Sequence, residues 1–234
     1  MKKTLLLLAL ISPARYVKAN LITNGDFESA LTGWTVTNEP GGNAGSNWFS
    51  QTGTLAPLTG FPVPAPPQGL RAAMTDSGGP GSHVLMQSFV VPDGITSVQL
   101  SFLLFIGNRV SDFFTPNSLD FNVNPNQQAR VDLLTAAGTP FDLTPADIVA
   151  NLYQTHEGDP PVSGYSLNSS IVSGLTPGAT YQLRFAEVDN ERQLEMGVDS
   201  VAVDAIPEPA TLGLVGLAGI ALVVSSLRAR ARRR

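Results

Sequence analysis

The feature that most constrains this chain is a series of short segments, each apolar on one side, separated by turns rich in Gly, Pro and Asn. In residues 98–106 the apolar residues alternate and would share one face of a strand: Val98, Leu100, Phe102, Leu104 and Ile106. Similar patterns predict strands at residues 69–74, 82–91, 128–133, 164–172, 181–185 and 196–204. Many short strands with one-sided alternation predict an all-β fold, an antiparallel β-sandwich.

Two segments depart from this pattern. Residues 144–149 are the helix candidate, because Thr144 could cap a helix and Pro145 suits its first turn. Residues 38–67 are rich in Gly, Asn, Ser and Thr and then in Pro, so no central strand is expected there. We interpret them as a long surface excursion within one domain.

The N-terminus has the pattern of a secretory signal peptide. Lys2 and Lys3 precede an apolar run over residues 4–11, which is too short to span a bilayer. Val17 and Ala19 occupy the positions that signal peptidase reads before Asn20. Residues 1–19 are therefore predicted to direct Sec export and to be removed. The alternative is a buried N-terminal helix.

The C-terminus has the pattern of a membrane anchor. Residues 210–227 carry no charge and, as a helix, would reach about 27 Å, enough for a thin bilayer core. The alternative is a C-terminal core helix. An arginine tail follows and is expected to stay cytoplasmic, which places the residues before Pro207 outside. This tail consists of Arg228, Arg230, Arg232, Arg233 and Arg234.

Between the sandwich and the anchor lie Pro207, Glu208 and Pro209, a segment that holds an extended backbone. This motif, the apolar segment and the arginine tail together resemble a PEP-CTERM sorting signal, which is found on exported proteins of Gram-negative bacteria that make extracellular polysaccharide. The resemblance implies recognition at the inner membrane by an exosortase, which removes the helix and passes the remainder to the cell surface. The expected division is signal peptide 1–19, passenger domain 20–205 and sorting signal 206–234.

The passenger carries a second resemblance at its two ends. Residues 20–28, with Gly33 and Trp34 close behind, resemble the start of galactose-binding-like jelly rolls, and residues 198–203 are similar to their last strand. The resemblance implies a jelly-roll sandwich whose first and last strands meet beside a structural Ca²⁺. Its hard oxygen ligands would be Asp26, Glu28 and Asp199, which could otherwise be solvated acids at strand ends. Residues 75–85 also resemble a stretch that recurs among PEP-CTERM passengers, which implies no chemistry.

Composition excludes several functions. Between residues 20 and 206 there are eighteen acidic residues, five arginines and no lysine, a formal charge of −13. Such a domain repels phosphate backbones, which excludes nucleic-acid binding, and it could attract divalent cations. The absence of cysteine excludes thiol nucleophiles and thiolate metal sites.

The sequence shows no catalytic motif, and we expect no enzyme. Ser82 and His83 are neighbours in a predicted strand, so their side chains point to opposite faces and cannot pair. His156 and Glu157 do not form the metalloprotease motif, and no nucleophile elbow or phosphate loop is present. Paired carboxylates of a glycoside hydrolase remain an alternative.

Aromatic residues in loop-like segments suggest binding. Trp48, Tyr153 and Tyr165 could stack on sugar rings, or could instead anchor loops, whereas Trp34 is assigned to the core. The sequence therefore predicts an exported protein of the cell envelope surface or the exopolysaccharide matrix, with a structural or glycan-binding role. The alternatives are a carbohydrate-active enzyme and a protein-binding adhesin.

Overall fold

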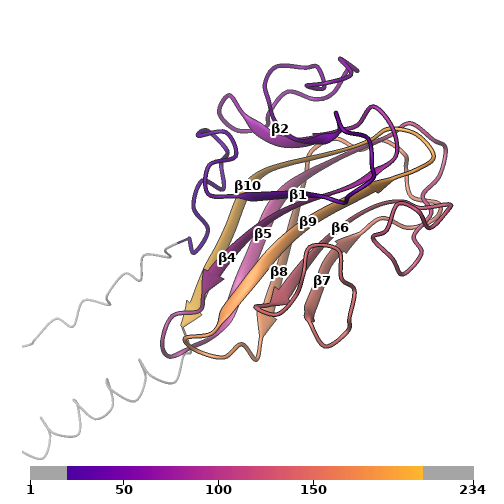
Figure 1. The fold of residues 1–234 in the computed structure, drawn as a ribbon. Helices are drawn as coiled ribbons and strands as arrows, with labels where there is room; N and C mark the ends of the chain where they lie inside the picture. The colour runs from indigo at the N-terminus through magenta and orange to yellow at the C-terminus, as the bar shows by residue number, and fades with distance from the viewer. Residues whose placement is uncertain (1–19, 208–234) are drawn as a thin grey trace, which may run out of the picture.

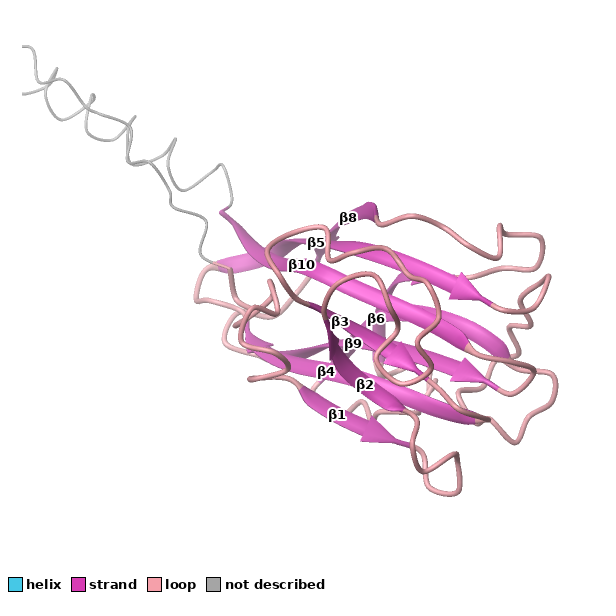
Figure 2. Ribbon diagram, turned by 90° about the horizontal axis from the view of Figure 1, so that it is seen from above, coloured by secondary structure: helices cyan, strands magenta, loops and turns pink. Residues whose placement is uncertain are grey.

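A computed structural model of the protein describes residues 20–207, which form two five-stranded antiparallel sheets packed face to face (Figure 1). The first, called here the β9 sheet after its central strand, has the order β1 (Thr35–Asn38), β4 (Gly81–Val90), β9 (Thr180–Asp189), β6 (Gln127–Thr135), β7 (Ile148–Gln154). The second, the β10 sheet, has the order β2 (Asn47–Gln51), β3 (Ala72–Asp76), β10 (Leu194–Pro207), β5 (Ile95–Asn108), β8 (Ser166–Ser173). The view in Figure 2 shows the strands of the two layers running roughly along one direction.

The order of the strands confirms the jelly roll. From β3 to β6 each strand lies in the sheet opposite its predecessor, and the chain crosses again after β7, β8 and β9. The result is two four-stranded arrays, β3-β10-β5-β8 and β4-β9-β6-β7, to which β2 and β1 add an edge strand each. Within residues 20–207 the structure has no helix, and so none that could cross a membrane.

The core between the sheets follows directly from the period-two alternation. Alternate residues of β5 from Val98 to Ile106 point inward and are each at most 2% exposed, as predicted. They meet Leu183 and Phe185 of β9, and Phe185 contacts Phe102 edge-to-face at 5.4 Å between ring centroids. Burying each such side chain contributes about 1.5–3 kcal/mol. Trp34 also lies in this core, as expected.

The opening segment of the domain pairs with its last strand. The amide of Leu21 donates to the carbonyl of Val203 at 2.8 Å, and the amide of Val201 donates to the carbonyl of Gly25 at 2.8 Å. A Cβ at residue 25 would lie 2.0 Å from the Val201 carbonyl oxygen, so only glycine permits this approach. The first and last parts of the sandwich therefore meet, as the resemblance implied.

One expectation about local structure is wrong. Residues 145–147 form a turn instead of a helix, and Ile148 already pairs with Leu134 of β6. Its β-branched side chain suits this strand, and pairing outweighs the local capping signal. Residues 38–67 contain no central strand, as expected, although β2 lies within them as an edge strand, the position that Gly- and Pro-rich surroundings allow.

The last strand runs two residues past the predicted domain boundary. Ile206 pairs with Ser97, and Pro207 with Ile95 after a register shift. Proline is acceptable there because β3 pairs with β10 only at Gly197 and Val198 and does not reach the end of the strand. The predicted signal peptide, the remaining sorting motif, the membrane helix and the arginine tail lie outside the described residues.

Candidate functional site

The three aromatic residues predicted to bind sugars do not form a common surface. Trp48 is 2% exposed, because its position on β2 points between the sheets, and a buried indole offers no face to a sugar; this corrects the expectation. Tyr165 packs on Phe105 with ring centroids 5.7 Å apart, and burial, reinforced by the charge of Asp199, raises the pKa of its hydroxyl. Tyr153 is half-buried on β7, where burial, with a contribution from the charge of Asp159, raises its pKa to about 12.

The predicted calcium ligands lie close enough for their charges to interact. Burial raises the pKa of Asp199 to about 6, hydrogen bonds from the Ser200 and Gln68 amides oppose this, and the charges of Glu28 and Asp26 raise it further. Glu28 Oε1 accepts the amides of Leu70 and Arg71 at 2.8 and 2.9 Å. A further feature of this region is left-handed backbone at non-glycine residues, which are Asn24, Phe27, Ala30 and Ser200.

The outer face of the β9 sheet is covered by two loops, residues 109–126 and 136–147. Apolar side chains on this face belong to β4, β9 and β6, and the loops pack Leu119, Phe121, Phe141 and Leu143 against them. This makes a small second core outside the sandwich. The sheet side chains in it are Val84, Met86, Leu134, Ala186 and Val188.

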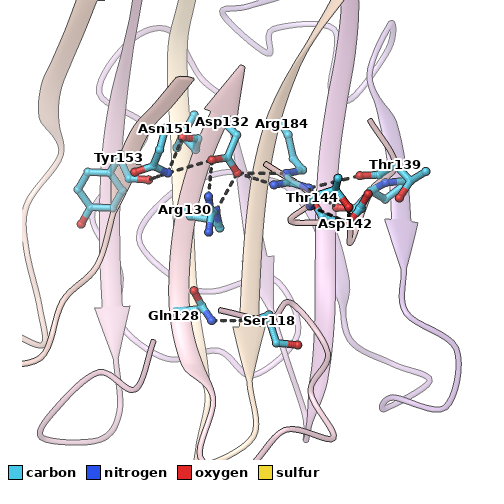
Figure 3. Close-up of polar contacts among 12 residues, drawn as sticks. Ser118, Gln128, Arg130, Asp132, Thr139, Asp142, Thr144, Asn151, Tyr153 and Arg184 are labelled. Atoms are coloured by element: carbon cyan, nitrogen blue, oxygen red, sulfur yellow. Dashed lines mark hydrogen bonds and ion pairs between the residues drawn. The ribbon is translucent and has the colours of Figure 1, made fainter. Parts of the chain in front are cut away.

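A buried ion cluster lies on the same face (Figure 3). Asp132 of β6 is held by Arg130, two positions along the same strand, and by Arg184, its paired residue on β9. Arg184 Nη2 lies 2.6 Å and Arg130 Nη2 2.7 Å from Asp132 oxygens, and Asn151 Nδ2 donates at 2.9 Å. Burial acts to raise the pKa of Asp132, but the hydrogen bonds and charges of these partners hold it below its usual value.

Arg184 also fixes the position of the 136–147 loop. Its Nη1 donates to the carbonyls of Thr139, Pro140 and Asp142 at 3.3, 3.0 and 2.8 Å. Gln182, two residues earlier on β9, donates to the carbonyls of Thr135 and Gly138. The carbonyls of an irregular loop lack the backbone hydrogen bonds that a strand or helix would provide. The side chains of Arg184 and Gln182 donate hydrogen bonds to them instead.

Amide side chains hold the 109–126 loop in the same way. Gln128 Nε2 donates to the carbonyls of Pro116 and Ser118 at 3.1 and 2.9 Å, and Asn190 Nδ2 to those of Phe121 and Val123 at 2.7 and 2.8 Å. Both loops are thus ordered by polar residues that project from the sheet beneath them.

Between the two loops lies a cleft of about 360 Å³, within the size range of small-ligand pockets. It combines carboxylates and hydroxyls with the apolar side chains of Leu119, Leu143 and Phe141. Asp142 Oδ1 accepts the amide and hydroxyl of Thr144 at 2.8 and 2.7 Å, and these hydrogen bonds lower its pKa. The lining residues are Glu39, Asn117, Ser118, Leu119, Asp120, Phe141, Asp142, Leu143 and Thr144.

Sequence reasoning missed this cleft although part of its signal was visible. Residues 128–133 were predicted as a strand, and Arg130 and Asp132 occupy its polar side. Polar residues on a strand normally face water, so their alternation indicates an open face. What the pattern could not show is that two loops would cover that face and bury the ion cluster.

No protein-family model and no curated protein matches the sequence. Among solved structures, the K3 cleaved adhesin domain of Lys-gingipain from Porphyromonas gingivalis W83 is similar, with 15% identity over 80% of this chain and 99% of that one and a TM-score of 0.48. TmCBM61, solved in complex with β-1,4-galactotriose, has 10% identity over 81% of this chain and 99% of that one, with a TM-score of 0.46.

The enzymatically active domain of tailspike protein 4 from bacteriophage CBA120 has 10% identity and a TM-score of 0.47. That match covers 80% of this chain, which spans only 21% of the tailspike chain. At such identities and TM-scores these likenesses say nothing about a ligand. The jelly-roll class of the protein rests on its own strand order.

Proposed function

We propose that this jelly-roll protein is an exported glycan-binding protein of the cell surface or exopolysaccharide matrix, and that the cleft between the 109–126 and 136–147 loops receives the sugar. The cleft itself is the observation that carries the proposal. Its carboxylates Glu39, Asp120 and Asp142 accept hydrogen bonds from hydroxyl groups, and Phe141 offers a ring to the apolar side of a sugar.

The charge of the cleft selects the class of glycan. Three carboxylates line it, whereas Arg184, on the face beneath it, is committed to Asp132 and to loop carbonyls. An acidic sugar would meet repulsion, so the ligand is a neutral or amino-bearing polysaccharide. An acidic polysaccharide would need a bridging cation.

We further propose that binding occurs without turnover. A glycosidase acid must hold its proton near neutral pH, which requires a raised pKa. The hydrogen bonds of Thr144 instead lower the pKa of Asp142. Release of reducing ends from a bound glycan would move the assignment to a carbohydrate-active enzyme.

The proposed cellular location rests on the sequence. The leader of residues 1–19, the Pro207-Glu208-Pro209 motif, the apolar segment and the arginine tail support Sec export, an inner-membrane intermediate and exosortase processing. Intact-mass analysis of protein released from cells should show a chain without its leader and without residues 210–234. Recovery of only the full-length chain, in the inner membrane, would contradict this.

We also propose that Asp26, Glu28 and Asp199 hold a structural Ca²⁺, completed by backbone carbonyls. The charge interaction of Asp199 with Glu28 and Asp26 supports it, as do the left-handed residues around the junction of the opening segment and β10. A hard cation such as Ca²⁺ would neutralise these carboxylates.

Affinity electrophoresis against the host's own exopolysaccharide and against neutral glycans tests the binding. Stacking and a few hydrogen bonds predict a Kd on the order of 10 μM to 1 mM. Phe141→Ala should weaken retardation by up to about tenfold, and Asp142→Asn by a similar factor. Phe114→Ala, at an exposed ring, and Asp159→Asn, at a half-buried aspartate, lie outside the cleft and are matched controls that should leave it unchanged.

Two results would overturn the proposal. Equal effects of the cleft variants and their controls would exclude the cleft as the site. No retardation by any glycan would leave a structural or protein-binding role, the adhesin alternative.

A further inference from the structure

A second group of titratable residues lies on the inner face of the β9 sheet, at the end where β4 begins and β9 ends. His83 of β4 is paired with Glu187 of β9, and Gly81 with Asp189, so the register places the three side chains side by side on one face. One donor atom of each lies within 4.8 Å of the others. All three residues are at most 1% exposed.

These groups have unused coordinating atoms. His83 Nε2, both carboxylate oxygens of Glu187 and Asp189 Oδ1 have no hydrogen-bond partner among the described residues. Buried polar atoms are almost always paired, and a buried carboxylate without a partner is strongly unfavourable. Protonation is one way to remove the unfavourable charge of these buried carboxylates. Burial accordingly raises the pKa of Glu187 well above its usual value and the pKa of Asp189 to about 7.

The orientation of His83 suits coordination of a metal ion. Asn38 Nδ2 donates to the carbonyl of Ser46 and to Asn47 Oδ1, so Asn38 Oδ1 faces His83 Nδ1 as an acceptor at 2.9 Å. His83 Nδ1 must therefore carry the hydrogen, which leaves the lone pair on Nε2, the ring nitrogen without a hydrogen-bond partner. A polar partner that fixes the imidazole from behind is the usual support of a metal-bound histidine.

The surrounding chain lets His83 approach the two acids and places Asp189 beside a hollow at the end of the sandwich. A Cβ at residue 81 would lie 2.6 Å from His83 Nε2, so glycine at this position lets the ring reach the site. Asp189 also lines a hollow of about 240 Å³ at the end of the sandwich, next to Gly79, Pro80 and residues 190–193. The segment 75–85, which the sequence analysis left without a chemical role, thus supplies both the histidine and the glycine beside it.

We propose that His83, Glu187 and Asp189 bind a divalent transition-metal ion of the Zn²⁺ or Mn²⁺ type. One imidazole nitrogen and two carboxylates match these ions, whereas Ca²⁺ prefers six to eight oxygen ligands. Four-coordinate Zn²⁺ would draw its ligand atoms to about 3.4 Å from one another. The ion would link β4 to β9 and neutralise acids whose nearest charged neighbours include Glu195 and Asp76.

The test is a calorimetric titration of the full-length protein, purified in detergent and stripped with EDTA, with ZnCl₂ and separately with MnCl₂. With ZnCl₂ the wild type should bind one ion per chain and gain about 5 °C in Tm at saturating metal. His83→Gln and Glu187→Gln should each weaken binding by roughly 100-fold, and Asn38→Ala by about 10-fold. His156→Gln, which alters the exposed second histidine, is the matched control and should bind as the wild type does.

Misfolding cannot imitate the expected result. Glu187→Gln keeps the shape of the side chain and removes a buried carboxyl group that can ionise, so without metal it should melt at or above the wild-type temperature while losing the zinc shift. The proposal is overturned if the wild type binds no stoichiometric metal, or if His83→Gln and Glu187→Gln bind it undiminished. Phe141→Ala should leave the titration unchanged, so the metal site and the glycan cleft can fail separately.

Discussion

Strands β6 and β9 carry buried carboxylates on both faces of their sheet. The carboxylates on the two faces differ in whether they have charged partners. On the outer face Asp132 is shared by Arg130 and Arg184 and accepts a further hydrogen bond from Asn151. On the inner face Glu187 and Asp189 have no cationic partner among the described residues. A paired acid can hold a loop in place, whereas an unpaired one must take up a proton or a cation.

The largest effect on stability should come from removing an arginine partner of Asp132 on the outer face. Arg184→Met leaves Asp132 with one arginine and leaves three loop carbonyls without their donor, so unfolding should become easier by about 3–5 kcal/mol. The midpoint of urea unfolding measures it. Arg192→Met, at an exposed arginine, should change stability by less than about 0.5 kcal/mol. A loss below about 1 kcal/mol for Arg184→Met would show that the ion cluster does not hold the loop.

The unpaired acids of the inner face should make the stability of the protein depend on pH. Asp189 has a folded-state pKa of about 7, above that of an unfolded aspartate, so between these values the folded state holds a proton that the unfolded state has lost. In EDTA, stability should therefore fall as pH rises from 4.5 to 7, by at most about 1.4 kcal/mol per unit from this group. Asp189→Asn should reduce the slope; parallel profiles of the two proteins would contradict it.

Asp132 should make stability depend on pH with the opposite sign, and in a lower pH range. Its pKa is lowered in the folded state, so its contribution is present above the unfolded value and is lost only as pH falls through the folded pKa. Unfolding measured below pH 4 should include the contribution of Asp132, and unfolding between pH 4.5 and 7 those of the inner acids and of Asp199.

Calcium should have an intermediate effect at a third location. If Asp26, Glu28 and Asp199 hold Ca²⁺ in the folded state, millimolar CaCl₂ should raise Tm by about 5 °C relative to EDTA. Asp199→Ala should abolish this shift and leave a β-rich circular dichroism spectrum. Identical melting in EDTA and CaCl₂ would remove the site, without bearing on His83 and its partners.

The smallest effect should come from the outer face of the β10 sheet. Ile171 of β8 is 65% exposed there, so Ile171→Ala should change stability by less than about 0.5 kcal/mol. Leu134 lies under the covering loops at 1% exposure, and Leu134→Ala should cost about 2–5 kcal/mol. Thermal denaturation of both variants measures the difference, and similar losses would mean that the loops do not bury this face.

The sequence predicted the sandwich because period-two alternation is a local property. Leu100 and Phe102 are both buried because they are two residues apart and therefore lie on the same, inward face of their strand. The candidate sites are different, since Asp132 meets Arg184 and His83 meets Glu187 only through pairings of strands far apart in the chain. Trp48 shows the same limit, because its burial depends on an edge strand within a segment whose composition indicated a loop.

The pairing of Asn20 with Asp204 places both ends of the described chain at one end of the sandwich, whereas the start of β10 lies at the other (Figure 1). At about 3.3 Å per residue, the 14 residues of β10 span about 46 Å along this axis. An anchor attached after Pro207 would therefore pull along β10 whenever a bound polymer is dragged by flow. Such a load shears the hydrogen bonds between β10 and β5 together instead of opening them one at a time, which is the direction in which a sheet resists force best.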